Sequence, residues 1–197
     1  MKKIAFSLGF ICVVSFADNQ QIVHLQGKES NGQVKFLAVG NPSFIKIEGV
    51  GKGANGNLAI EGKKAKGQFH FNLDSLDTGM DLRNEHMKSK YLQTNSFPES
   101  VLNIEDFVLK SDYDPKVGLG TGEFKGTLTL RGETRPVTCS YISVPMGNGK
   151  EKISAKFDLQ LTDYKVDIPT FSGITVANKV MVEVESILEA AKEEAAR

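Results

Sequence analysis

From about Ile22 to Ile187, the chain consists of short runs in which apolar and polar residues alternate, separated by turn residues. Phe69, Phe71 and Leu73, for example, alternate with polar residues, which is the period of a strand with one buried face. About eight or nine such runs follow one another at hairpin spacing. This pattern predicts an all-β antiparallel domain, either a barrel or a sandwich.

Asn-Gly pairs precede three of these runs. Because both central residues of a type I′ turn need positive φ, Asn-Gly between strand-like runs is the strongest short-range hairpin signal. Another group of glycines lacks the Lys-Ser/Thr and the following helix of a phosphate-binding loop, so we interpret its members as turn glycines. The expected hairpins are at Asn31-Gly32, Asn55-Gly56 and Asn148-Gly149, and the glycine group is Gly49, Gly51, Gly53 and Gly56.

One long stretch, Leu76 to Glu99, departs from the strand pattern. Thr78 followed by Asp81 is typical of a helix N-terminus, where a hydroxyl and a carboxylate satisfy free backbone amides. After Asp81 neither Gly nor Pro occurs until Pro98, which predicts a short helix inserted between two strands. An insertion of this size in a tightly turned strand protein is more often functional or cavity-covering than a simple connector.

Composition limits the classes of protein to consider. A chain of 197 residues with 40% hydrophobic residues is long enough for one domain with a real core and short for two. The 24 basic and 24 acidic residues cancel, so no basic excess points to nucleic acid as a partner. The segment from Leu188 to Arg197 is rich in Ala, Glu and Lys, and we expect it to be a helical or frayed polar tail.

Residues 1–17 have two lysines, then an apolar run, then small residues that end at Ala17. This order predicts a secretory signal peptide cleaved after Ala17, and therefore a periplasmic or secreted protein. A signal anchor is the alternative, but the run is short for a span of about 20 residues. Ile11 before Cys12 argues against a lipoprotein. The expected organisation is a signal peptide at 1–17, one domain at 18–187 and a tail at 188–197.

Cleavage would leave Cys139 as the only cysteine, which excludes a disulfide within the mature chain. Cys139 alternates with Val137 and Tyr141, as a small core residue on a strand face does. A reactive thiol is the alternative interpretation.

The sequence carries few features of an enzyme. His24, His70 and His86 fall on separate expected elements, and the chain has neither an HExxH motif nor a GxSxG motif. We therefore expect a non-catalytic protein without a metal site or a cofactor. A small hydrolase or metal enzyme is a further alternative, which would need a partner for His86.

Three segments resemble the YceI-like family: TGMDLRNEHMKSKYL followed by FPE, GTLTLRGETRPV at 126–137, and IPTFSGITVANKVMVEVE at 168–185. Members of that family are lipocalin-like antiparallel barrels, typically exported by bacteria, and several hold a long isoprenoid or other lipid. The resemblance implies an eight-stranded barrel that binds a polyisoprenoid, an isoprenoid quinone or a fatty chain. Where the family often has Arg-Asp before the helix His, this chain has Arg83-Asn84.

An eight-stranded barrel is either filled by side chains or holds one small ligand. If it holds a ligand, the inward strand residues would form an apolar lining and the insertion would lie at the mouth. Arg83 and His86 would then bind a head group there, since a guanidinium suits a pyrophosphate, and Met87 would be an adaptable apolar contact. The expected lining is Phe36, Phe69, Phe71, Leu73, Phe124, Leu128, Phe157 and Leu159, and the expected mouth is Arg83, His86, Met87 and Tyr91.

Two alternatives remain open at this point. The aromatic residues are equally compatible with an ordinary filled core, and Arg83 with a local salt bridge. In that case the protein would be a secreted stress-response or interaction protein with a solid barrel, and its function would lie on the 76–99 surface. The sequence also leaves the oligomeric state open, a homodimer being one alternative.

Overall fold

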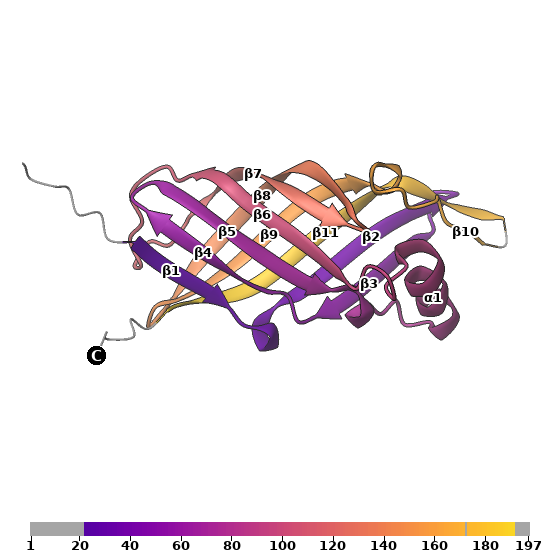
Figure 1. Cartoon of the computed structure of the whole chain (residues 1–197), viewed down its shortest axis with the longest axis horizontal. Helices are drawn as coiled ribbons and strands as arrows, with labels where there is room; N and C mark the ends of the chain where they lie inside the picture. Colours follow the sequence, from indigo (N-terminus) through magenta and orange to yellow (C-terminus); the bar gives the residue numbers. More distant parts are fainter. Residues whose placement is uncertain (1–21, 172, 192–197) are drawn as a thin grey trace, which may run out of the picture.

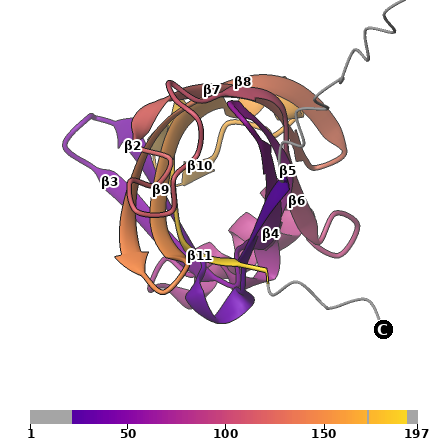
Figure 2. The ribbon, with the colours of Figure 1, turned by 90° about the vertical axis from the view of Figure 1, so that its left-hand side faces the viewer.

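The computed structural model of the chain describes residues 22–171 and 173–191, which form an antiparallel β-barrel with one short helical insertion (Figures 1 and 2). Helix α1 spans Asp81–Glu85 and continues as a π-helical segment, His86–Leu92. Short 3-10 turns lie at Glu29–Asn31, Leu73–Ser75 and Leu161–Tyr164. The strands are β1 (Ile22–Gly27), β2 (Gln33–Asn41), β3 (Lys46–Lys52), β4 (Asn55–Glu61), β5 (Lys64–Asn72), β6 (Glu99–Val108), β7 (Thr121–Leu130), β8 (Glu133–Gly147), β9 (Lys150–Gln160), β10 (Thr170–Phe171) and β11 (Ile174–Ala190).

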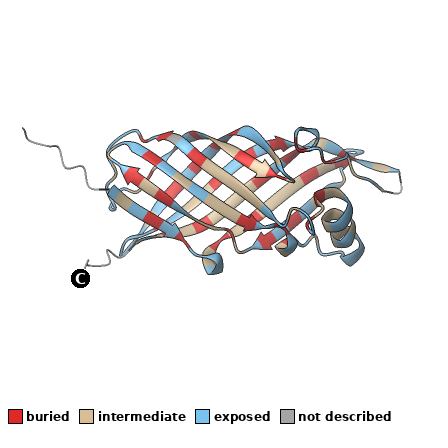
Figure 3. Cartoon of the chain, viewed as in Figure 1, coloured by how far each residue is buried: buried red, intermediate tan, exposed pale blue. Residues whose placement is uncertain are grey.

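The strands pair around the barrel in the order β1-β4-β5-β6-β7-β8-β9-β11, and β11 pairs with β1 to close it. The helical insertion lies between β5 and β6. Buried residues alternate with exposed ones along the strands, whereas the helical insertion is mostly exposed or half-buried (Figure 3). The predicted all-β, eight-stranded antiparallel barrel is confirmed, and the sandwich alternative is wrong.

Strand β11 is 17 residues long and spans two shorter strands on one side. Its C-terminal end, Leu188–Ala190, pairs with β1, and the stretch from Thr175 to Glu185 pairs with β2. Because β3 pairs with β2 and β4 pairs with β1, β1–β2 and β3–β4 each act as one long interrupted strand. Strand β4 pairs with β5, but its continuation β3 pairs with the insertion instead. Two backbone hydrogen bonds between Val50 of β3 and Asp77 make this contact (2.9 and 2.8 Å).

The hairpin prediction holds at one of the three Asn-Gly pairs. Asn148 and Gly149 join β8 to β9 with φ of 53° and 70°, as a type I′ turn requires. Asn31-Gly32 instead lies in the interruption between β1 and β2, and Asn55-Gly56 begins β4. None of these four residues has the positive φ that a type I′ turn requires. Arg131-Gly132, which lacks Asn, supplies the two positive φ values of the β7–β8 hairpin.

The barrel domain ends later in the sequence than the expected residue 187. Strand β11 continues to Ala190, and Leu188 is fully buried opposite Gly27. The expected helical or frayed tail is therefore wrong for residues 188–190, because Leu188 extends the inward apolar alternation of the strand. Residues 192–197 and the expected signal peptide lie outside the described residues.

The predicted helix exists, but its N-terminal cap differs from the prediction. Met80 is the N-cap, without a side-chain bond, and Gly79 has φ of +74°, which places Thr78 outside the helix. The Thr78 amide and hydroxyl both donate to Asn84 Oδ1 (2.8 Å each), and the Asn84 amide nitrogen donates to Asp77 Oδ1 (2.7 Å). One Asn side chain thus fastens the helix to the segment that pairs with β3.

The β6–β7 connection, residues 109–120, lies at one end of the barrel, and Figure 2 looks along the barrel from this end. Just inside, Phe107 packs edge-on against Tyr141 (4.9 Å between ring centroids) and lies 5.3 Å from the Phe124 ring. The Tyr141 hydroxyl donates to the Leu119 carbonyl of the connection (3.2 Å). Aromatic packing therefore fills this end of the interior.

A buried carboxylate on β9, Glu151, fixes the same connection. It accepts hydrogen bonds from the Leu119 amide, the Ser143 hydroxyl and the Tyr113 hydroxyl. Burial nevertheless raises the pKa of Glu151, because loss of solvation outweighs the Leu119 and Tyr113 donors, which lower it. The ionised form is thus disfavoured in the folded state.

Replacing Glu151 by Gln should stabilise the protein at neutral pH. The amide keeps the acceptor for Leu119 and Ser143 and can donate to Tyr113, while it carries no buried charge. Because the pKa of Glu151 lies above its ordinary value of 4.5 in the folded state, wild-type stability falls as pH rises above that value. The advantage of Glu151→Gln in free energy of unfolding should therefore grow with pH, to on the order of 1 kcal/mol at pH 7.

Urea denaturation at several pH values measures this difference, and Glu189→Gln is the matched control. Hydrogen bonds from Lys28 and Lys150 lower the pKa of Glu189, so this carboxylate stabilises the fold above its ordinary pKa and loses that effect as pH falls. The two variants should show opposite trends with pH. An advantage of Glu151→Gln that grows as pH falls would contradict the account.

Replacing Asn84 by Asp should loosen the insertion. The pKa of Asp77 is lowered by the Gly79 amide and the Asn84 side chain, so a second carboxylate at position 84 would face an ionised one. Asn84→Ala removes the bonds without adding repulsion and is the matched control. Hydrogen exchange measured by mass spectrometry at pH 7 should be fastest across 80–92 in the Asp variant, intermediate in the Ala variant and slowest in the wild type. Equal exchange in both variants would show that repulsion plays no part.

Candidate functional site

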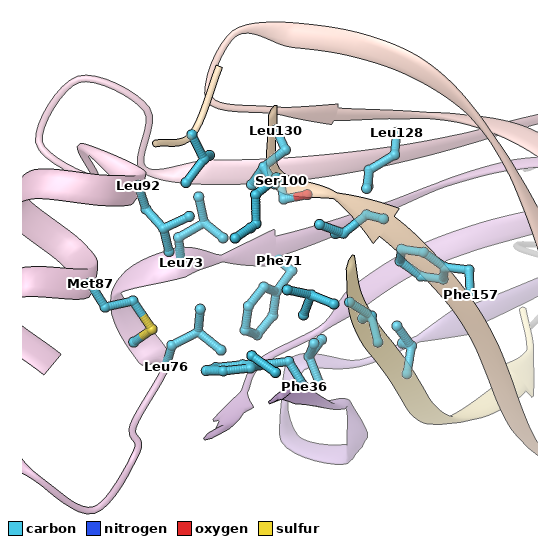
Figure 4. Close-up of a pocket in the computed structure, with 18 of the residues that line it drawn as sticks. Phe36, Phe71, Leu73, Leu76, Met87, Leu92, Ser100, Leu128, Leu130 and Phe157 are labelled. Carbon is cyan, nitrogen blue, oxygen red and sulfur yellow. The ribbon is translucent and has the colours of Figure 1, made fainter. Parts of the chain in front are cut away.

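The interior toward the insertion end is not filled: it contains a cavity of about 550 Å³ (Figure 4). This volume lies within the range of about 300 to 1,000 Å³ that is usual for ligand pockets. The walls are formed almost entirely by apolar side chains from β2 to β7, from β9 and from β11. The solid-barrel alternative required a filled interior, which this cavity contradicts.

The structure places the eight expected lining residues in the cavity wall. Strand alternation accounts for most of them: Phe69 and Phe71 are two residues apart on β5, and Phe157 and Leu159 are two residues apart on β9. Leu73 lies just past β5, in the 3-10 turn that leads into the insertion. Contact of these residues with a ligand stays a prediction. The eight are Phe36, Phe69, Phe71, Leu73, Phe124, Leu128, Phe157 and Leu159.

Two glycines of β3 determine where two of the aromatic rings lie. A Cβ at Gly49 would be 2.2 Å from the Phe36 ring, and a Cβ at Gly51 would be 2.5 Å from the Phe71 ring. The rings therefore lie directly on the β3 backbone, which only glycine permits. The interpretation of Gly49 and Gly51 as turn glycines is wrong, because both lie inside a strand and make room for the cavity wall.

Part of the wall is formed by residues outside the predicted lining, although the sequence contains a signal for them. Val180, Val182 and Val184 of β11 line the cavity, and their alternation is visible in the sequence. Ala38 and Ala155 also line it, and their small side chains leave space where larger ones would fill the barrel. The predicted lining contained only Phe and Leu residues and so missed these Val and Ala positions.

The cavity meets the insertion at its open end, where the structure brings together all four expected mouth residues, Arg83, His86, Met87 and Tyr91. They lie on the α1 and π-helical segment, and Met87 points toward Leu76 and Phe36 in Figure 4. A π-helical segment is rare and frequently occurs at functional sites.

Arg83 is half-buried, and its guanidinium contacts Met80 Sδ (2.7 Å). Within residues 22–171 and 173–191 no ion pair to Arg83 is formed, so the local salt-bridge alternative is wrong for this part of the chain. Arg83 and Lys46 both line the cavity. The otherwise apolar lining therefore includes two cationic side chains.

Large apolar side chains are exposed on the elements around the mouth. Phe44, in the β2–β3 connection, is 81% exposed, and Met80 and Leu82 of the insertion are 53% and 52% exposed. Ile45 and Ile174 line the opening between these elements. The rim of the cavity is thus apolar as well as its walls.

Other candidate chemistry is structural or is held by local contacts, although His70 is among the residues that line the cavity. Cys139 is fully buried on β8, and burial raises the pKa of its thiol to about 12, as expected for a core residue. His70 contacts Glu99 (3.0 Å) and Gln68 (2.8 Å). Across the described residues there is no cluster of three or more His, Cys, Asp or Glu side chains suited to a metal ion. None of the helices in the described ranges is long and apolar enough to span a membrane.

Solved structures of low sequence identity share this fold. Burkholderia cenocepacia BcnA is 14% identical, with a TM-score of 0.65, and the alignment covers 79% of this chain and 95% of BcnA. A polyisoprenoid binding domain from Saccharophagus degradans, implicated in plant cell wall breakdown, is 13% identical with a TM-score of 0.64, over 87% of this chain and 100% of that domain. The Campylobacter jejuni YCEI protein is 17% identical with a TM-score of 0.52, over 75% of this chain and 86% of that protein.

The sequence itself carries the family assignment. No curated protein matches it. The YceI-like domain matches residues 26–188, which include every strand of the barrel except the first residues of β1 and the last of β11. The chain therefore belongs to the YceI-like domain family.

Proposed function

We propose that the protein binds and carries a long apolar ligand inside the barrel, without catalysis. The observation that carries this proposal is the cavity of about 550 Å³, which is apolar along its walls and open beside the insertion. The fold similarity to a polyisoprenoid binding domain supports the choice of a polyisoprenoid, an isoprenoid quinone or a fatty chain. Export after cleavage at Ala17 is part of the same proposal, since the N-terminal pattern is that of a signal peptide.

Burial of the chain supplies the affinity in this proposal. At about 0.8 kcal/mol per methylene, one five-carbon isoprene unit contributes up to about 4 kcal/mol. Association costs about 4 to 15 kcal/mol, so a few buried units suffice for useful binding. Burial alone would discriminate poorly between an isoprenoid and a fatty chain that fill the same space, which leaves specificity to polar contacts.

The head group would lie at the mouth, beside Arg83 and His86. Arg83 presents a planar guanidinium that suits bidentate contact with a phosphate or another oxygen-rich group. It faces the opening without a carboxylate partner among the described residues, so a ligand oxyanion would meet an available charge. Met87 would adapt to the first part of the apolar chain.

Filling the cavity should abolish binding. Ala155 lies on β9 between Val184 and Tyr141, and a Phe side chain at this position would project into the cavity. Ala59→Phe, on the outer face of β4, adds the same ring away from the cavity and is the matched control. Titration calorimetry with geranylgeraniol and palmitate should show at least about tenfold weaker binding for Ala155→Phe alone, a loss of about 1.4 kcal/mol. Equal affinities in both variants would place the ligand elsewhere.

Arg83→Gln should weaken binding only where the head group is anionic. We expect about tenfold lower affinity for geranylgeranyl diphosphate, because a charge-assisted hydrogen bond is lost, and no change beyond about twofold for geranylgeraniol. Lys66→Gln, an exposed residue of β5, controls for the change in net charge. The same loss for both ligands would mean that Arg83 supports the structure of the mouth and does not bind the head group.

A further inference from the structure

The inward face of β11 is apolar except at one position. Val180, Val182, Val184, Ser186 and Leu188 alternate along the strand, so Ser186 stands where the pattern calls for an apolar side chain. Ser186 is only 4% exposed and lines the cavity. Its hydroxyl has no hydrogen-bond partner in the described part of the chain.

Ser186 lies in the part of the cavity far from the mouth. Six residues of strand separate it from Val180, a distance of about 20 Å along β11. Ile153 on β9 is directly opposite, and a Cβ at Gly27 of β1 would be 2.9 Å from Ser186 Oγ. The hydroxyl is therefore surrounded by apolar side chains and paired backbone.

Two other hydroxyl groups in the cavity wall, those of Ser100 and Thr78, donate hydrogen bonds to partners within the protein. Ser100 donates to the Thr129 carbonyl (3.1 Å), and Thr78 donates to Asn84 (2.8 Å). Ser186 differs because nothing in the described chain meets its bonding capacity. An unsatisfied buried hydroxyl lowers stability, so a polar atom of another molecule would offset that cost.

A trapped water is a poor match for this position. A buried water usually makes two to four hydrogen bonds, and the inward neighbours of Ser186 along β11, Val184 and Leu188, have apolar side chains that offer none. Glu151 is the next inward residue after Ile153 along β9, but its carboxylate is occupied by Leu119, Ser143 and Tyr113. No charged side chain lines this part of the cavity within the described residues, which disfavours a charged ligand group there.

We propose that Ser186 is a specificity residue for a ligand whose buried end carries a neutral oxygen, either a hydroxyl or a carbonyl. The inference rests on the proposed function and adds a second polar contact, at the opposite end of the ligand from Arg83. A serine hydroxyl can donate to a carbonyl or accept from an alcohol, so both groups fit. The neutral oxygen is either at the tip of the chain or in a head group that is inserted first.

A comparison of ligands that differ only at the tip tests this assignment. Palmitate and 16-hydroxypalmitate would be titrated into the wild type, into Ser186→Ala and into Ser140→Ala, an exposed serine on the outer face of β8. The ratio of the two affinities isolates the contact between the tip and residue 186. We expect Ser186→Ala to shift the ratio against 16-hydroxypalmitate by about fivefold, the effect of one ordinary neutral hydrogen bond. Ser140→Ala should leave the ratio unchanged.

Geranylgeraniol distinguishes the two sources of the oxygen, because its only oxygen is in the head group. Weaker binding of geranylgeraniol to Ser186→Ala would show that the head is inserted first, and an effect confined to 16-hydroxypalmitate would place the oxygen at the tip. An unchanged ratio together with unchanged geranylgeraniol binding would overturn the assignment while the carrier proposal stands. Failure of all three ligands to bind the wild type would overturn both.

A second measurement needs no ligand. If the Ser186 hydroxyl is unsatisfied in the free protein, Ser186→Ala should have a higher melting temperature than the wild type, although it binds the polar-tipped ligand less tightly. A lower melting temperature would show that the hydroxyl already has a bond in the free protein, which would contradict the proposal.

Discussion

Closure of the sheet through β11 is the constraint on which the rest of the structure depends. This one strand pairs with β9 on one side and with both β1 and β2 on the other. Closure removes sheet edges and forces every second residue of each strand into a common interior. Because β11 is longer than its partners, the barrel extends well beyond the β1–β11 contact, and the cavity continues into that extension as far as the insertion.

The barrel interior has a packed part and an open part, and the size of the inward side chains determines which is which. Toward the β6–β7 connection, Phe107, Phe124 and Tyr141 pack together, and the buried Glu151 holds the connection over them. Toward the insertion, small residues such as Ala38 and Ala155 and the side-chain-free Gly49 and Gly51 leave space. The same strands therefore supply a packed core that stabilises the fold and an apolar cavity that is available to a ligand.

The sequence predicted what depends on strand period and missed what depends on pairing between distant strands. Alternation was sufficient to place Phe69, Phe71 and Phe157 on the inner face. It did not show that Gly49 lies under Phe36 across the β2–β3 pair, or that Asn55-Gly56 belongs to a strand, because both follow from sheet register.

The contacts at the mouth and at the buried end of the cavity could not be predicted from the local sequence pattern either. The four mouth residues share the insertion, so their proximity to one another was predictable. The tie between Asn84 and Asp77 and the unsatisfied hydroxyl of Ser186 depend on neighbours that only the folded chain brings together. The Arg83-Asn84 pair illustrates the point, since Asn84 both donates and accepts where an aspartate would repel Asp77.

The most direct test of the central claim is native mass spectrometry, combined with organic extraction, of the protein purified from the cells that produce it. The account predicts a bound lipid of defined mass whose extract identifies a prenyl or fatty chain. A bare protein mass that stays unchanged after incubation with prenyl and fatty chains would contradict the carrier function.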